Sequence, residues 1–256
     1  MGHVTGIDSL AYNSRALYWP PAGKLLLSVC LLVGSLSSYN LYGPAIVLGV
    51  GLFLFLYSVK GNLPSFILLL IAAVMAFNAV GVIIIAATQA GSPVFSISLP
   101  FIVINISQEG LDLAALVFLR SFAGLFVVLF FASSTPIPHI FNSLKKMGLP
   151  DYIAEITVLV YRYSFMILEQ SEQMVNAAGC RLGFSGWWNY MRTTGTLTAN
   201  LFIRSLEFAE RSQNALQSRN FTGSFPVFRE PKRITTVWIF LSLAVFASVY
   251  LIGNIR

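Results

Sequence analysis

Two arginines occupy the same place in a repeated segment of this 256-residue chain. One copy runs from Leu168 to Arg181 and the other from Leu206 to Arg219, and six of the fourteen positions are identical. Such internal similarity reports a duplicated structural unit. Because a guanidinium is a planar fork of donors that fits a carboxylate, the pair predicts two equivalent contacts with acidic groups of a partner. A single arginine at a helix end could instead only complement the helix dipole.

The residues around the two arginines complete the predicted contact sites. Ala177 and Ala215 are small and would permit close approach of a partner. Beyond the arginines we pair Gly183 with Asn220, one residue being dropped from the second copy. The repeat itself thus offers Arg181, Arg219, Ala177 and Ala215 as candidate contact residues.

Two long helices must position these arginines, over residues 151–180 and 190–218. Thirty residues at about 1.5 Å each reach about 45 Å. An amphipathic helix precedes them, with apolar residues at helical spacing from Ile137 to Met147. We expect the hydroxyls of residues 133–135 to cap its start, with Pro136 at the first helical position, and Gly148 and Pro150 to end it.

Composition predicts a membrane protein of all-α class. The chain is 56% hydrophobic and 10% charged, against about 25% charged residues in soluble domains. Eleven of the sixteen Lys and Arg residues lie between Asn142 and Arg233. We therefore predict a membrane domain over 1–132, a cytoplasmic coupling-helix domain over 133–233 and a final transmembrane helix over 234–256. Basic excess favours the cytoplasmic side for the N-terminus and for 133–233.

Five apolar stretches predict about five membrane crossings, with Lys24 flanking the first on its inner side. Alternating residues between 90 and 110 predict an external extended segment rather than a helix. Arg120 lies inside the fourth span, where a charge is costly and faces protein or water. It could have a function, or pair with Glu109, Asp112 or a backbone carbonyl. The predicted spans are 25–39, 45–59, 66–87, 113–132 and 235–252.

Residues for catalysis or for metal binding do not cluster in the sequence. His3 and His139 are far apart, and the glycine loop that binds nucleotide phosphates is absent. Cys30 and Cys180 have unlike surroundings, so no disulfide is expected. We therefore expect a non-enzymatic chain that binds neither metal nor nucleotide itself. The alternative is a stand-alone carrier of a metal ion or small metabolite driven by an ion gradient, which needs titratable groups within the membrane; only Arg120 qualifies.

Several of these motifs resemble the transmembrane (T) component of energy-coupling-factor (ECF) transporters, of the cobalt type called CbiQ. That family carries a pair of Ala-Arg-Gly motifs, which correspond here to residues 179–183 and 217–220, each with its arginine kept. The resemblance implies that the ATPase-coupling residues, besides Ala177 and Ala215, are Arg181, Arg219, Cys180, Leu182, Gly183, Ser218 and Asn220. Residues 134–136 followed by 148–150 resemble the Thr-Pro and Gly-Leu-Pro segment of the family. Residues 109–120 resemble its Glu-Gly to Leu-Arg stretch, and residues 8–15 resemble the cobalt-type N-terminus.

The resemblance implies an assembly in a bacterial or archaeal plasma membrane. Two ABC-type ATPase subunits, which hold ATP and Mg, would each bind the end of one of the two helices that carry Arg181 and Arg219. A separate substrate-binding membrane subunit, the cobalt S component, would hold the cobalt ion and be gripped by the membrane helices. The family also leaves room for a small accessory membrane subunit, and no nucleic acid is expected. Arg120, Thr135, Pro136 and Pro150 would pack in the membrane or against a partner.

Overall fold

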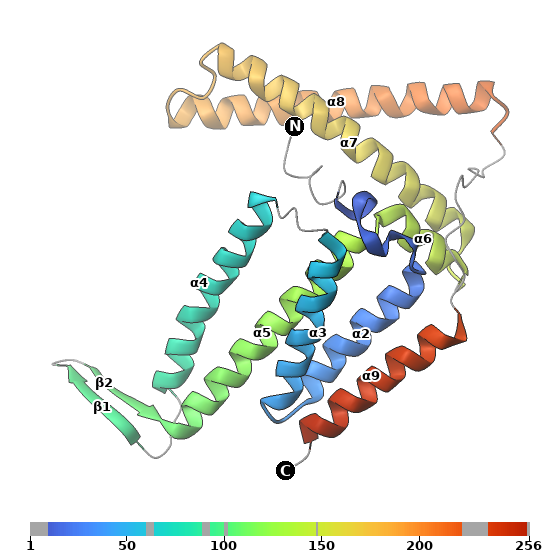
Figure 1. Cartoon of the computed structure of the whole chain (residues 1–256). Helices are drawn as coiled ribbons and strands as arrows, with labels where there is room; N and C mark the ends of the chain where they lie inside the picture. Colours follow the sequence, from blue (N-terminus) through green and yellow to red (C-terminus); the bar gives the residue numbers. More distant parts are fainter. Residues whose placement is uncertain are drawn as a thin grey trace. The chain divides into compact units, whose positions relative to one another are not determined.

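The computed structural model describes residues 10–59, 64–88, 93–99, 102–146, 148–221 and 235–254 (Figure 1). It confirms a helical polytopic architecture, with one two-stranded antiparallel hairpin in the segment predicted to be extended. The elements are η1 (Arg15–Tyr18), α2 (Pro21–Ser37), α3 (Tyr42–Val59), α4 (Ser65–Thr88), β1 (Pro93–Leu99), β2 (Ile102–Ser107), α5 (Gln108–Ser134), α6 (Ile137–Lys146), α7 (Asp151–Cys180), α8 (Trp187–Ser218) and α9 (Thr236–Asn254).

The chain divides into two compact units. The first comprises residues 1–140 and 231–256, and the second comprises residues 141–230. The division falls within α6, whose first residues belong to the first unit and contact its N-terminal segment. The rings of His139 and Tyr12, for example, meet edge to face at 6.5 Å.

The first unit is a bundle of apolar helices. α3 packs most extensively against α5, α2 packs against α9, and α4 joins the bundle through α5 (Figure 1). Buried aliphatic and aromatic side chains from these helices form one core, in which Val47, Phe55, Val127 and Phe130 are at most 1% exposed. Four described helices, α3, α4, α5 and α9, are long and apolar enough to cross a membrane. α2 is apolar but has only 17 residues, against about 20 for a full crossing.

Lys24 lies inside α2 and not beside it, contrary to the sequence prediction. The helix begins at Pro21, where proline suits the first turn. The Lys24 side chain is 1% exposed. Its ammonium donates hydrogen bonds to the carbonyls of Ala16, at 3.1 Å, and Ser134, at 2.6 Å. This charge therefore links the N-terminal segment, α2 and the end of α5.

Arg120 also binds backbone, which was one of the alternatives left open by the sequence. Its guanidinium donates to the carbonyl of Ser38, just after α2. The Ser38 hydroxyl donates to the carbonyl of Asn40 at 3.0 Å and to that of Gly253, in α9, at 3.4 Å. A Cβ at Gly253 or at Gly43 would collide with the Ser38 side chain. Arg120 thus fixes a crowded crossing between α5, the α2–α3 connection and the end of α9.

The predicted capping of α6 by hydroxyls is wrong. Ser133 and Ser134 are the last residues of α5, and the Ser133 hydroxyl bonds to the Phe130 carbonyl, at 3.3 Å, and to the Ser58 hydroxyl, also at 3.3 Å. α6 begins one residue after Pro136, whose carbonyl accepts from the His139 N–H at 3.0 Å. The Ser133 hydroxyl, which the local sequence predicts to cap α6, therefore bonds between α5 and α3 instead.

Two further helix starts differ from the prediction. α5 begins at Gln108, so residues 108–110 form its first turn rather than the close of the extended segment. α8 begins at Trp187 instead of residue 190, since Gly186 adopts φ 83° and ψ 154°, which suits glycine, and lets the helix start directly after it. The predicted limits of α7, 151 and 180, are confirmed.

Candidate partner-binding site at the ends of α7 and α8

α7 and α8 end in the same backbone geometry. Arg181 closes α7 with φ −96° and ψ 16°, and Arg219 closes α8 with φ −96° and ψ 14°. The next residues, Leu182 and Asn220, have positive φ values of 54° and 51°. Each arginine is therefore the last residue before the chain turns into the left-handed region.

The hydrogen bonds of the two caps match one for one. After α7, the Leu182 N–H donates to the Gly179 carbonyl at 3.0 Å, and the Gly183 N–H donates to the Ala178 carbonyl at 2.9 Å. After α8, the Asn220 N–H donates to the Gln217 carbonyl at 3.0 Å, and the Phe221 N–H donates to the Leu216 carbonyl at 3.0 Å. Both are Schellman motifs, which satisfy carbonyls that a helix end otherwise leaves free.

This geometry corrects the way in which the repeat was extended past the arginines. The sequence pairing set Gly183 against Asn220 with one residue dropped. In the structure Leu182 and Asn220 are the equivalent left-handed residues, and Gly183 corresponds to Phe221. The repeat therefore keeps its spacing of 38 residues through the cap. Thr222 and Gly223, the residues that follow in the second copy, lie outside the described residues.

The predicted contact residues lie on the surface of the second unit. Gly183 is half-buried and the other eight are exposed. Leu182 is 76% exposed, although it is a large apolar residue. Cys180 is a free thiol. The side chains that could meet a partner at either helix end are thus accessible.

The turn after α7 rests firmly on α8, through a residue that the sequence analysis missed. The Thr193 hydroxyl donates to the Gly183 carbonyl at 2.6 Å. A Cβ at Gly183 would lie 3.0 Å from the Ala178 carbonyl oxygen and 3.1 Å from the Thr193 side chain. A side chain at position 183 would therefore force the Ala178 carbonyl or Thr193 to shift, because the turn and α8 approach so closely. No local signal in the sequence marks Thr193 as the partner of Gly183.

α7 and α8 bury little of their surface against each other. No described residue of α8 is buried, although the helix is 32 residues long. Tyr163 of α7 meets Phe208 of α8 edge to face at 5.4 Å. Large apolar side chains on the same two helices nonetheless stay exposed, including Phe202 at 64% and Val160 at 57%. Exposed apolar surface of this kind is typical of interaction sites.

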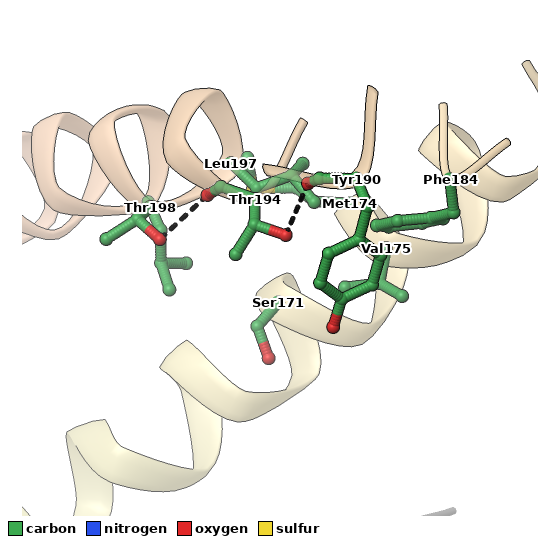
Figure 2. Close-up of a pocket in the computed structure, with 9 residues that line it drawn as sticks. Ser171, Met174, Val175, Phe184, Tyr190, Thr194, Leu197 and Thr198 are labelled. Atoms are coloured by element: carbon green, nitrogen blue, oxygen red, sulfur yellow. Dashed lines mark hydrogen bonds between the residues drawn. The ribbon is translucent and has the colours of Figure 1, made fainter. Parts of the chain in front are cut away.

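A cavity of about 420 Å³ between α7 and α8 does not have the chemistry of a ligand site (Figure 2). The hydroxyls of Thr194 and Thr198 donate to carbonyls of their own helix, those of Tyr190 and Thr194, at 2.8 and 2.9 Å. Met174, Val175 and other apolar groups form most of the remaining wall. Because these hydroxyls are already used, the space is best described as a packing gap between two helices.

Of the other predicted packing residues, Thr135 and Pro136 lie in the first unit and Pro150 lies in the second. Thr135 is 3% exposed, and Pro136 is among the fully buried residues. Pro150 directly precedes α7, and its carbonyl accepts from the Ile153 N–H at 3.1 Å. Among the residues described by the structure, no group of three or more His, Cys, Asp or Glu side chains could hold a metal ion.

Comparison with known proteins places this architecture in a family. Residues 13–231 match the family described as cobalt transport protein, CbiQ. An uncharacterized protein of Methanocaldococcus jannaschii is 27% identical over 94% of this chain and 89% of its own length. The cobalt transport protein CbiQ of Salmonella typhimurium is 25% identical over 87% of this chain and 99% of its own length.

A further relative joins two parts in one polypeptide. The putative fused cobalt transport protein CbiMQ of Methanocorpusculum labreanum is 29% identical over 90% of this chain, which spans only 38% of that protein. The family match covers the helices from α2 to α8 and both arginine caps. Together with the apolar helices, it identifies a multi-pass membrane protein. The chain belongs to the CbiQ family of cobalt transport proteins.

Proposed function

We propose that this chain is the transmembrane coupling subunit, or T component, of an ATP-driven ECF-type cobalt importer. The observation that carries the proposal is the pair of matched caps at Arg181 and Arg219. Two identical backbone frames, each presenting an exposed arginine, fit a partner that offers two equivalent acidic sites. A pair of ABC-type ATPase subunits is such a partner.

The cap geometry favours a partner contact over a role confined to the helix end. The Ala178 and Gly179 carbonyls of α7 already accept backbone N–H groups, as do the Leu216 and Gln217 carbonyls of α8. The arginine side chains are therefore not needed to satisfy these carbonyls. Because the backbone of each cap is fixed, only the rotamers of the arginine side chain must be ordered when its guanidinium binds a carboxylate in bidentate fashion.

α7 and α8 are suited to carry a movement of the ATPases. They have 30 and 32 residues, which corresponds to about 45 to 48 Å each. In the proposed mechanism, ATP and Mg are held by the ATPases, and closure of the ATPases displaces the helix ends. α7 and α8 pass this displacement to the membrane helices. The second unit and the N-terminus then lie on the cytoplasmic side of a bacterial or archaeal plasma membrane.

The cobalt ion would be held by a separate membrane subunit. The described part of this chain groups no three metal-binding side chains. The relative named as a fused cobalt transport protein CbiMQ supports a partner in cobalt transport, since much of that polypeptide lies beyond the region that this chain matches. A small accessory membrane subunit could complete the assembly. Arg120 does not favour the alternative of a self-sufficient carrier, because its guanidinium binds the Ser38 carbonyl.

Charge reversal at both caps tests the proposal. The full chain carrying Arg181→Glu and Arg219→Glu is co-expressed with the ABC-type ATPase encoded nearest to it in its genome. We expect the ATPase to be lost from the purified complex while the chain keeps its helical content and elution volume. The matched control is Arg211→Glu, an exposed α8 arginine that pairs with Glu207 at 3.4 Å. Retention of the ATPase by the double variant, or cobalt uptake into liposomes by the chain alone, would contradict the proposal.

A further inference from the structure

The two arginine caps share a backbone but differ in the chemistry that they present. At the end of α7 the left-handed residue is Leu182, and α8 starts five residues later with Trp187 and Trp188. These three side chains are 76%, 68% and 84% exposed. At the end of α8 the left-handed residue is Asn220. The left-handed residue is therefore apolar at the α7 cap and polar at the α8 cap.

Leucine is a poor choice for the conformation that Leu182 adopts. Left-handed backbone places the Cβ of an ordinary residue close to the following carbonyl oxygen, and asparagine and glycine tolerate it better. α6 ends in the same hydrogen-bond pattern with Gly148 at the equivalent position, at φ 111°. The left-handed residue after α6 carries no side chain, whereas after α7 it carries a large apolar one. Strain of this kind persists where the surrounding structure enforces it, and it often marks functional positions.

The turn that carries Leu182 is held in place from several sides. The Ser185 N–H and the Ser185 hydroxyl both donate to the Leu182 carbonyl, at 3.1 and 2.9 Å. The Asn189 amide donates to the Ser185 carbonyl at 2.9 Å, and Thr193 fixes Gly183. The leucine is thus presented on a preorganised turn, which lowers the entropy cost of binding.

We infer that Leu182 is an apolar anchor for the ATPase subunit that binds the α7 cap, so that this cap binds more tightly than the α8 cap. The inference rests on the proposed function and deepens it. The equivalence of the caps argues that both meet the same kind of partner, and the adjacent Arg181 selects an acidic surface. The anchor fits a small apolar pocket beside a carboxylate on that ATPase, and Trp187 and Trp188 extend the apolar contact. Aromatic residues and arginine are typical of residues that dominate binding energy.

Leu182→Gly separates stability from binding. Glycine relieves the left-handed strain and removes only an exposed side chain, so we expect the thermal unfolding temperature of the full chain in detergent to stay level or rise. Affinity for the co-expressed ABC-type ATPase is expected to fall about tenfold or more, as the burial of a leucine side chain would give. The control is Ile203→Ala, which truncates an exposed apolar side chain of α8 away from the caps, with a change in affinity of less than about threefold.

The outcomes distinguish this inference from the proposed function. If the ATPase binds the wild type and is lost from the double arginine variant, but Leu182→Gly binds it equally well, the anchor is wrong and the coupling role stands. If the wild type does not bind the ATPase, the proposed function itself fails. If Leu182→Gly lowers the unfolding temperature, Leu182 supports the fold, which also overturns the inference. The inference is also overturned if Leu182→Gly loses affinity for vesicles of anionic lipid that contain no ATPase while its affinity for the ATPase is unchanged. The α7 cap would then be a membrane contact.

Discussion

The Lys24 ammonium lies 2.6 Å from the carbonyl oxygen of Ser134, the last residue of α5. Lys24 is on the first turn of α2, so this bond joins two helices through residues that are 110 positions apart in sequence. The Lys24 ammonium also donates to the Ala16 carbonyl. This one buried cation therefore connects the N-terminal segment to the end of α5. The next residues after α5 lead into α6, so this bond lies near the exit from the membrane helices.

Replacement of Lys24 by methionine tests the importance of this link. Methionine keeps the apolar stem but leaves the Ala16 and Ser134 carbonyls without their donor. We expect a loss of about 2 kcal/mol in the free energy of unfolding, measured by denaturant titration in detergent. Arg211→Met, at an exposed site, is the control and is expected to change stability little. Equal stability of the two variants would show that the Lys24 bonds contribute nothing.

The crossing at Ser38 predicts a specific rescue. Gly253→Ala adds a Cβ that collides with the Ser38 side chain, and overpacking of this kind costs about 1 to 3 kcal/mol. Adding Ser38→Gly removes the obstructing side chain and is expected to restore much of the loss. The comparison of both single variants with the double variant measures the coupling between the two sites. Simple additivity would contradict the crowding.

Leu182→Asn makes the α7 cap resemble the α8 cap. Asparagine tolerates the left-handed region, and the leucine that it replaces is 76% exposed, so almost no apolar burial is lost. We expect an increase of about 1 kcal/mol in unfolding free energy. Thermal or denaturant unfolding of the full chain measures it. Asn220→Leu introduces the left-handed strain at the α8 cap and is expected to lower the free energy of unfolding.

Single arginine reversals predict a graded loss of ATPase binding. If each cap holds one subunit of a paired ATPase, Arg181→Glu or Arg219→Glu alone leaves one contact, and the remaining contact still benefits from the pairing of the subunits. The double variant is then expected to lose more affinity than the two single variants would suggest. Native mass spectrometry of the complexes, with the subunit count as readout, checks this. Complete loss in both single variants would argue against two separate contacts.

The sequence alone was sufficient for the coarse architecture and for the arginine pair. Long apolar stretches in a chain with few charges specify membrane helices, because the hydrocarbon region demands them. The positions of α7 and of the hairpin also followed from local pattern, since helix stops and alternation are short-range signals. The matched surroundings of Arg181 and Arg219 were visible because a duplication leaves identical residues at constant spacing.

Only the tertiary structure decided what several polar residues do. Lys24 and Ser133 have local patterns typical of a flanking charge and a helix cap, but distant carbonyl and hydroxyl groups bind them. The contact between Thr193 and Gly183 and the collision of Ser38 with Gly253 likewise join residues whose separation along the chain says nothing of their distance. The left-handed turn at Leu182 belongs with these cases, because leucine does not favour it locally. Side-chain partners depend on how helices pack, and packing is set by the whole set of buried surfaces, not by any single stretch of sequence.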